Sequence, residues 1–234
     1  MARIILITGG SRSGKSEYAR RLAEGVPGQR TFIATAVAMD VEMRERIRKH
    51  REARSKTDWK LLEEPLELVR AIRSSEESAV ILVDCLTLWI NNLMHEAGEN
   101  TVTPREIAGT NVCGDTKREE ARSTMRINSH LQQPDRDAES GNVSSINKGS
   151  RDISSITEEI ISTRCEEVIE ACRRNRGTVV FVANEVGMGI VPDNSASRLF
   201  RDLAGRCNQV MAAAADEVTL VVCGLPVYVK RAHS

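Results

Sequence analysis

The sequence has few aromatic residues and no excess of charge of either sign. Aromatic residues make up 3% of its 234 residues, and 33 basic side chains balance 33 acidic ones. Proteins that bind single-stranded nucleic acid stack bases on aromatic side chains in a basic groove, so this composition argues against that class. Zero net charge likewise provides no overall attraction to nucleic acid or to an anionic membrane. The sequence therefore predicts no nucleic-acid partner.

Paired cysteines and long apolar runs are also missing. The six cysteines are scattered, without a C-x-x-C pair or the spacing of a zinc site. No apolar run reaches the length of a membrane span, and the opening stretch MARIILITGG is too short and too soon broken to be a signal peptide. We therefore expect a reduced, cytoplasmic protein without a membrane span.

The sequence does contain a regular alternation of apolar strands and amphipathic helices. The predicted strands are residues 3–8, 31–36, 79–85, 178–184, 218–224 and 226–230. The predicted helices are residues 15–25, 40–54, 66–74, 86–97, 158–175 and 196–217, the last with Ser195 as its cap. This alternation, with strands that are apolar throughout, predicts an α/β fold with a mostly parallel sheet flanked by helices.

One motif identifies a phosphate-binding loop. The stretch GGSRSGKS matches G-x-x-x-x-G-K-[ST], follows a predicted strand and opens a predicted helix. In such a loop, backbone N–H groups and the helix N-terminus bind phosphate oxygens, the lysine reaches the β and γ phosphates, and the serine hydroxyl binds Mg²⁺. A chance glycine-rich turn is the alternative. The predicted nucleotide-binding residues are Gly9, Gly10, Ser11, Arg12, Ser13, Gly14, Lys15 and Ser16.

Asp84 ends the buried stretch VILVD. P-loop proteins often place an acidic residue at such a strand end to hold Mg²⁺, so Ser16 and Asp84 are the predicted metal ligands. An ordinary strand-end or helix-capping aspartate is the alternative.

A histidine lies within a cluster of arginines in MRERIRKHREARSKTDW, residues 43–59. If this stretch is helical, Arg46 and Arg54 lie one turn to either side of His50. Nearby cations lower the pKa of a histidine and keep its imidazole neutral and nucleophilic, while arginines can bind a triphosphate. His50 also continues an apolar stripe with Met43 and Ile47, and this pattern alone favours a structural histidine.

Residues 97–157 break the alternation. They are rich in Ser, Asn, Asp, Arg and Gly and contain no aromatic residue. Such a segment buries too little apolar surface to offset its chain entropy. We therefore expect one P-loop nucleotide-binding domain over residues 1–234, with a mobile polar insertion at 97–157. A regulatory or partner-binding loop is the alternative.

Together these stretches resemble the bifunctional adenosylcobinamide kinase / adenosylcobinamide-phosphate guanylyltransferase family of cobalamin synthesis. The resemblance covers residues 3–96 and 158–230 and rests on ITGGSRSGKS, ATAVAMDVEMRERIRKHREAR, LVDCLTLWINNL and ANEVGMGIVPDNSASRLFRDLAGRCNQVMAAAADEV. It implies a RecA-like P-loop fold assembled as a homo-oligomer, namely a trimer. It also implies phosphorylation of adenosylcobinamide by ATP or GTP, followed by transfer of GMP from GTP to adenosylcobinamide phosphate, with Mg²⁺ as cofactor.

The resemblance assigns roles to individual residues. The family pattern R-I-x-x-H matches RIRKH, which makes His50 the catalytic residue that carries GMP. Ser55 stands where the family commonly has proline. The further nucleotide contacts carried over by position are Ala34, Thr35, Ala36, Arg51, Glu52, Ala53, Arg54, Glu63 and Asp84.

Two other functions compete with this reading. One is a P-loop kinase of another small molecule, in which His50 is structural. The other is a nucleotide switch or nucleic-acid-dependent ATPase, which the scarcity of aromatic residues disfavours. No motif identifies the general base of a kinase step.

Overall fold

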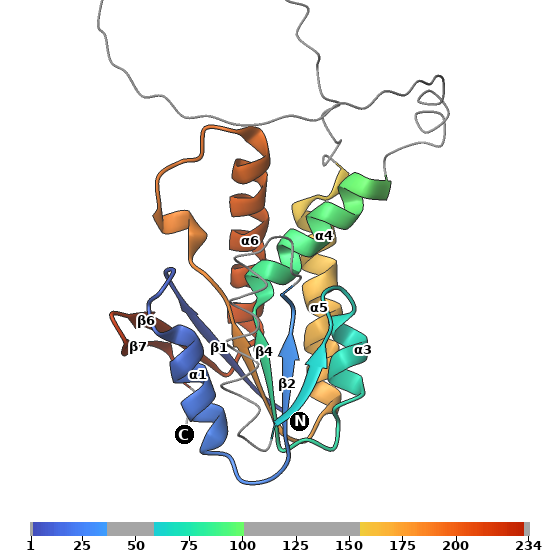
Figure 1. The fold of residues 1–234 in the computed structure, drawn as a ribbon, viewed down its shortest axis with the longest axis vertical. Coiled ribbons are helices and arrows are strands. Elements are labelled where there is room, and N and C mark those ends of the chain that lie inside the picture. Colours follow the sequence, from blue (N-terminus) through green and yellow to red (C-terminus); the bar gives the residue numbers. More distant parts are fainter. Residues whose placement is uncertain (1, 37–58, 101–154, 232–234) are drawn as a thin grey trace, which may run out of the picture. The chain divides into compact units, whose positions relative to one another are not determined.

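A seven-stranded sheet forms the centre of the structure (Figure 1). The computed structural model describes residues 2–36, 59–100 and 155–231. The strands run in the order β3-β2-β4-β5-β1-β6-β7, and every neighbouring pair is parallel except β6 and β7. They are β1 Arg3–Gly9, β2 Arg30–Ala34, β3 Trp59–Glu63, β4 Val80–Asp84, β5 Thr178–Val182, β6 Glu217–Val222 and β7 Leu225–Lys230. The predicted α/β fold with a mostly parallel sheet is confirmed.

Helices pack on both faces of this sheet. Among the described helices, α1 packs on one face and α3, α4, α5 and α6 pack on the other. The helices are α1 Lys15–Glu24, α3 Leu68–Arg73, α4 Leu86–Asn100, α5 Glu158–Arg174 and α6 Ser195–Ala214, with a short 3₁₀ turn, η3, at Val186–Met188.

Strand β1 shows why its sequence is apolar throughout. Successive strand residues point to opposite faces of a sheet. Ile5 and Ile7 accordingly pack with the residues of α1, whereas Ile4 and Leu6 pack with those of α5 and α6. All four are at most 3% exposed, and each contributes about 2 kcal/mol through burial. The strand is therefore held from both sides, directly before the phosphate loop.

Strand β3 is an element that the sequence pattern did not predict. It lies at the edge of the sheet and pairs with β2. Three of its five residues are exposed, so it needs no continuous apolar run and shows none. Trp59 anchors it, because its ring packs edge-on against Phe32 with the ring centroids 6.1 Å apart.

Strands β6 and β7 form an antiparallel hairpin closed by Cys223 and Gly224. The φ angles of these two residues are 52° and 80°, and positive φ at both positions is typical of a type I′ turn. The amide of Gly224 donates a hydrogen bond to the carbonyl of Ser13 at 2.8 Å. The hairpin turn therefore rests against the phosphate loop.

Helix α6 begins and ends earlier than predicted. The expectation that Ser195 caps it is wrong, because Ser195 is already helical and the Asn194 side chain accepts the hydrogen bond from the Ser197 amide at 2.7 Å. At the other end, the Asp216 amide donates to the Ile4 carbonyl of β1 at 2.8 Å. This pairing with β1 draws the chain out of the helix before residue 217.

The polar segment 97–157 lies mostly outside the described residues, but its two ends do not. Helix α4 continues to Asn100. Ile156 is 5% exposed within the core, and the Thr157 hydroxyl caps α5 by accepting from the Ile160 amide at 3.3 Å. The predicted helix at 40–54 falls entirely outside the described residues.

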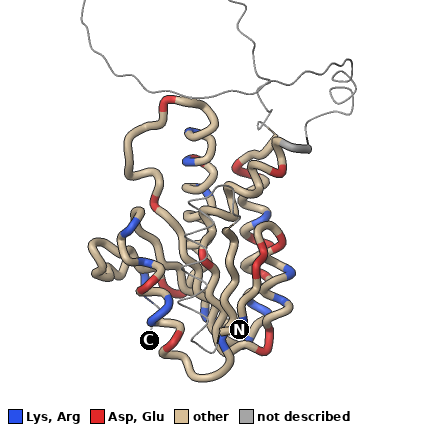
Figure 2. The backbone as a smooth tube through the Cα atoms, in the orientation of Figure 1, with Lys and Arg blue, Asp and Glu red and all other residues tan. Residues whose placement is uncertain are grey.

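Charged residues of both signs are interspersed along the described helices (Figure 2). On α1, Glu17 pairs with both Arg20 and Arg21, and on α5 Arg174 pairs with Glu170. This mixing agrees with the zero net charge of the chain. Within the described part of the chain, no helix is long and apolar enough to cross a membrane.

Candidate nucleotide-binding site

The phosphate loop connects the end of β1 to the start of α1, and its glycines are required by geometry. A Cβ atom on Gly9 would lie 2.5 Å from the Val221 carbonyl oxygen and 2.6 Å from Ser13 Oγ. Gly14 has a φ of 91°, which side chains rarely adopt, and a Cβ there would lie 3.2 Å from the Cα of Gly224. The loop is therefore enclosed by the ends of β6 and β7, and glycine is needed at both positions.

The start of α1 leaves backbone donors for a ligand. Gly14 is the N-cap residue and has no side chain to satisfy the N–H groups of the first turn. Uncapped N–H groups at a helix N-terminus, together with the helix dipole, favour an anion. This geometry suits a phosphate, and the assignment of residues 9–16 to phosphate binding stays a prediction from the sequence.

Lys15 belongs to the same loop. It is 8% exposed, and its Nζ donates to the Gly10 carbonyl at 3.1 Å. Burial of its ammonium group lowers the pKa of Lys15, while the nearby Cys85 and Asp84 act in the opposite direction. The lysine is thus held within the loop, where its charge can meet a phosphate.

Ser13 supplies a further polar group inside the loop. Its Oγ is buried and has no hydrogen-bond partner among the described residues. Buried hydroxyl groups are normally hydrogen-bonded, so this atom is one that a bound phosphate could satisfy.

The carboxyl ends of β5, β4, β2 and β3 lie in a row beside the carboxyl end of β1 and extend the candidate site. Ile7 of β1 pairs in register with Val182 of β5, Val182 pairs with Asp84 of β4, and Asp84 pairs with Ala34 of β2. Ala34 in turn pairs with Glu63 of β3. Residues predicted from distant parts of the sequence therefore lie along one edge of the sheet, which is where ligands bind in open parallel sheets.

Ser16 and Asp84 suit the predicted Mg²⁺. Both are partly exposed at this edge, and both offer the oxygen ligands that Mg²⁺ prefers. The residues that the structure describes contain no group of three or more His, Cys, Asp or Glu able to hold a metal. A P-loop site needs no such group, because Mg²⁺ keeps several waters and takes the remaining ligands from the phosphates.

Thr35 is placed at this edge, but its hydroxyl is committed to the protein. Thr35 Oγ1 donates to the Cys85 carbonyl and accepts from the Cys85 amide, both at 2.8 Å. Its carbonyl accepts from Asn92 Nδ2 at 2.8 Å, and the residue is fully buried. Within the predicted stretch from Ala34 to Ala36, Thr35 therefore joins β2 to the end of β4.

The two adjacent glutamates at the end of β3 differ in their surroundings. The Glu64 carboxylate accepts from the Leu66 and Glu67 amides and from Arg70. Burial alone would raise the pKa of Glu64, but these hydrogen bonds, that to Arg70 above all, lower it overall. Glu63 is exposed at the strand end. Glu64 thus supports the start of α3.

The predicted nucleophile lies outside the described residues. His50, and with it Arg51, Glu52, Ala53 and Arg54, falls within residues 37–58. Their assignment stays a prediction from the sequence.

One residue at this edge was not predicted. Glu185 follows β5, its amide donates to the Gly9 carbonyl at 3.1 Å, and its Oε1 accepts from Thr8 Oγ1 at 2.6 Å and from Asn208 Nδ2 at 3.1 Å. The signal in the sequence was an acidic residue just beyond a buried strand. Acidic residues at such positions are common. Only the pairing of β5 with β1 shows that this one lies next to the phosphate loop.

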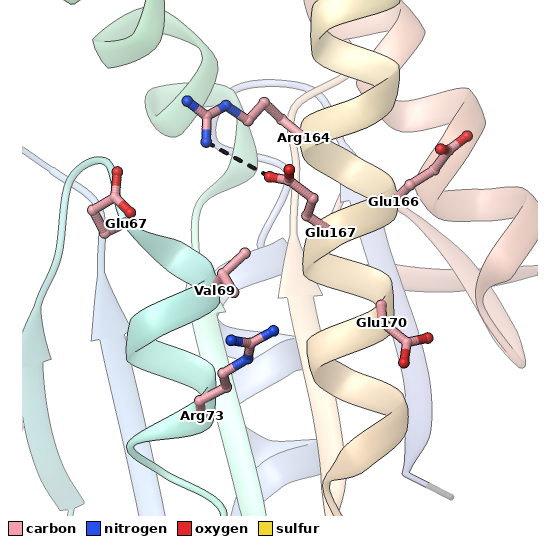
Figure 3. A pocket seen from close by; sticks show the side chains of 7 residues that line it. All are labelled: Glu67, Val69, Arg73, Arg164, Glu166, Glu167 and Glu170. Atoms are coloured by element: carbon pink, nitrogen blue, oxygen red, sulfur yellow. Dashed lines mark ion pairs between the residues drawn. The ribbon is translucent and has the colours of Figure 1, made fainter.

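A separate hollow lies between α3 and α5, on the face of the sheet opposite α1 (Figure 3). It has a volume of about 520 Å³. An ion pair of 3.6 Å between Arg164 and Glu167 lies at its rim. Its lining residues are Glu67, Val69, Arg73, Arg164, Glu166, Glu167 and Glu170. Four carboxylates against two guanidinium groups disfavour a nucleotide, so this hollow is not the phosphate site.

Comparison with known proteins shows similarity along nearly the whole chain, and not only at the phosphate loop. The bifunctional adenosylcobalamin biosynthesis protein CobU of Escherichia coli is 34% identical over 228 residues, which cover 97% of this chain and 99% of that protein. CobU of Salmonella typhimurium is 35% identical over 230 residues, with 97% and 99% covered. The bifunctional adenosylcobalamin biosynthesis protein CobP of Pseudomonas aeruginosa is 34% identical over 226 residues, with 96% of each covered.

The similarity to these relatives includes the residues before and after the polar segment 97–157, and the same is true of a family match. Residues 5–229 match the family described as cobinamide kinase / cobinamide phosphate guanyltransferase. That range includes the phosphate loop, the strand ends that line the site and the stretch that contains His50. The chain therefore belongs to the cobinamide kinase / cobinamide phosphate guanyltransferase family.

Proposed function

We propose that this protein phosphorylates adenosylcobinamide with ATP or GTP and then transfers GMP from GTP to the resulting phosphate. The near full-length family match carries this proposal. The glycine-enclosed phosphate loop supports the kinase step, because it offers Lys15 and uncapped backbone N–H groups to a triphosphate. The alternative, a P-loop kinase of another small molecule, has no comparable support.

In the kinase step the chain positions the triphosphate and the acceptor. The loop N–H groups hold the phosphate oxygens, and the Lys15 ammonium stabilises negative charge on them. Ser16 and Asp84 would hold Mg²⁺. When bound, the ion neutralises charge that develops on the phosphates. Thr35 keeps Asp84 in place, since it bonds the backbone of the next residue, Cys85.

In the guanylyl step, His50 acts as the nucleophile. A neutral imidazole attacks the α-phosphorus of GTP, the bond to pyrophosphate breaks, and a GMP–histidine intermediate results. The phosphate of the second substrate then attacks the same phosphorus and displaces the histidine. The arginines beside His50, Arg51 and Arg54, would stabilise the charge on the transferring group.

Assembly and setting complete the proposal. We expect a homo-oligomer, a trimer by resemblance. Apolar residues exposed on β7 and at and after the end of η3 are consistent with surfaces between subunits, namely Met188, Ile190, Val191, Leu225 and Val229. A reducing, cytoplasmic setting suits the buried thiols of Cys165 and Cys207, whose sulfurs lie 3.5 Å apart.

The test uses GTP labelled at the α-phosphate, with Mg²⁺ and without corrinoid, followed by denaturation and a count of the label on the protein. We expect acid-labile, base-stable label on the wild type and none on His50→Ala. His95→Ala is the matched control, because His95 is exposed on α4 and should keep the label. A parallel assay with γ-labelled ATP and adenosylcobinamide should transfer label to the corrinoid.

Wild-type protein that binds GTP but retains no label would refute the histidine mechanism. Label that persists on His50→Ala and is lost from His95→Ala would show that His95, and not His50, carries GMP. Absence of labelled corrinoid would refute the kinase step.

A further inference from the structure

Glu185 stands next to the phosphate loop in a well-defined position. Its amide bonds the first glycine of the loop, and its carboxylate is held by Thr8 of β1 and Asn208 of α6. Asn208 Nδ2 also donates to the carbonyl of Asn184 at 3.1 Å, and the Asn184 amide donates to Thr87 Oγ1 at 2.7 Å. Groups from β1, α4 and α6 therefore fix the end of β5.

The two oxygens of this carboxylate differ. Both hydrogen bonds from Thr8 and Asn208 go to Oε1. Within the described part of the chain, Oε2 receives none. One oxygen is thus used to orient the group, and the other remains available as an acceptor.

This carboxylate lies at the end of the loop where the terminal phosphate is expected. Lys15 Nζ lies 3.1 Å from the Gly10 carbonyl, and the lysine of a P-loop reaches the β and γ phosphates. Gly9 and Gly10 therefore mark the γ-phosphate end, and Glu185 bonds Gly9 directly.

The chain beyond Glu185 leaves room for a second substrate. Residues 187–190 are exposed. A Cβ atom on Gly187 would meet no atom within 4 Å. The chain directly beyond Glu185 is therefore open on the side of η3, the side from which we expect the acceptor molecule to approach.

We propose that Glu185 is the general base of the kinase step, an inference that rests on the proposed phosphorylation of an alcohol. The acceptor hydroxyl hydrogen-bonds to Glu185 Oε2. Its oxygen attacks the γ-phosphorus, its proton passes to Oε2, and the bond from the γ-phosphorus to the bridging oxygen breaks. The nucleoside diphosphate leaves with that electron pair, and the protonated carboxyl returns its proton to water.

A purely structural role is the competing explanation, and glutamine separates the two. Glu185→Gln keeps an oxygen that accepts from Thr8 and Asn208, so the loop stays in place, but it removes the proton acceptor. General bases contribute about 10²- to 10⁴-fold to a rate. We therefore expect kcat for phosphorylation of adenosylcobinamide to fall at least about 100-fold, with KM for ATP within about threefold of the wild type.

The same preparations are assayed for label from α-labelled GTP, since this half-reaction uses no acceptor hydroxyl. Glu185→Gln should retain it. Glu170→Gln, an exposed carboxylate on α5, is the matched control and should leave both activities unchanged. Glu185→Ala with added sodium formate gives a second readout, in which a small carboxylate replaces the missing base and restores part of the rate.

The outcomes separate the two proposals. If the wild type does not phosphorylate adenosylcobinamide, the proposed function fails, and this inference with it. If the wild type is active and Glu185→Gln keeps kcat within threefold, the inference alone is overturned. Equal loss of kinase activity, GMP labelling and nucleotide binding in Glu185→Gln, or no rescue of Glu185→Ala by formate, would assign Glu185 a structural role.

Discussion

Thr35 lies on the nucleotide side of the sheet, but we expect its hydroxyl to contribute to the stability of the fold rather than to nucleotide binding alone. Thr35 is fully buried and forms two hydrogen bonds of 2.8 Å with the backbone of Cys85. Valine has nearly the same shape but cannot form either bond. Thr35→Val therefore leaves the Cys85 amide without this partner, while the Cys85 carbonyl keeps its bond from the Trp89 amide at 3.2 Å. Thr35→Ser keeps both bonds to the hydroxyl.

The size of the effect follows from these contacts. A buried polar group left without its partner costs about 1–3 kcal/mol, so the loss of the only such partner of the Cys85 amide among the described residues lowers the free energy of unfolding by about 2 kcal/mol. For a chain of this length, that corresponds to a fall in Tm of roughly 4–8 °C. Thr35→Ser loses only a methyl group, which costs about 1 kcal/mol.

Thermal unfolding followed by circular dichroism at neutral pH measures this order. Thr163→Val is the matched control, because the exposed Thr163 hydroxyl bonds only the Glu159 carbonyl within α5, and its Tm should shift by about 1 °C or less. A Thr35→Val protein that melts within 2 °C of the wild type, or above Thr35→Ser, would refute the role given to the hydroxyl.

Two further predictions concern the loop and helix α1. Gly9→Ala should lower Tm by several degrees and weaken nucleotide binding at least tenfold, because its Cβ would lie 2.5 Å from the Val221 carbonyl oxygen. A Cβ on Gly10 would meet no atom within 4 Å, so Gly10→Ala should melt close to the wild type. Equal Tm values for the two variants would contradict this prediction. The hydrogen bond from Arg20 chiefly lowers the pKa of Glu17 to about 2 from 4.5. A lowered carboxyl pKa stabilises the fold above about pH 4.5, and this contribution is lost as the pH falls towards 2. Because Glu17 is 47% exposed, Glu17→Gln should cost only about 0.5 kcal/mol at pH 7 and less at pH 2, where much of the Glu17 charge is lost. Urea unfolding at the two pH values should therefore show a difference between variant and wild type that shrinks on acidification rather than grows.

The phosphate loop could be predicted because its chemistry is local. Gly9, Gly14, Lys15 and Ser16 all lie within residues 9–16, and this one stretch supplies the turn, the helix start and the charge. The buried strands could be predicted for a similar reason, since burial on both faces makes each of them apolar throughout.

The roles of Thr35 and Glu185 could not be predicted in this way. Position in the sequence placed Thr35 near the ligand, but its partners Cys85 and Asn92 lie 50 and 57 residues away. Glu185 takes its orientation from Thr8, 177 residues away, and from Asn208. In both cases the role comes from the order in which the strands pair, and no short sequence pattern records that order.

The place of β1 in the sheet has a consequence for how the protein is made. The phosphate loop is synthesised before β5, β6 and β7, yet β1 pairs with β5 and β6, and the Ile4 amide bonds a side chain 212 residues later. Contacts between such distant segments form late and slow folding. The nucleotide site is therefore completed only when the β6–β7 hairpin has been synthesised and its turn meets the loop. Acquisition of nucleotide binding during synthesis thus reports the pairing of β1 with β5 and β6, although the motif itself lies within residues 9–16.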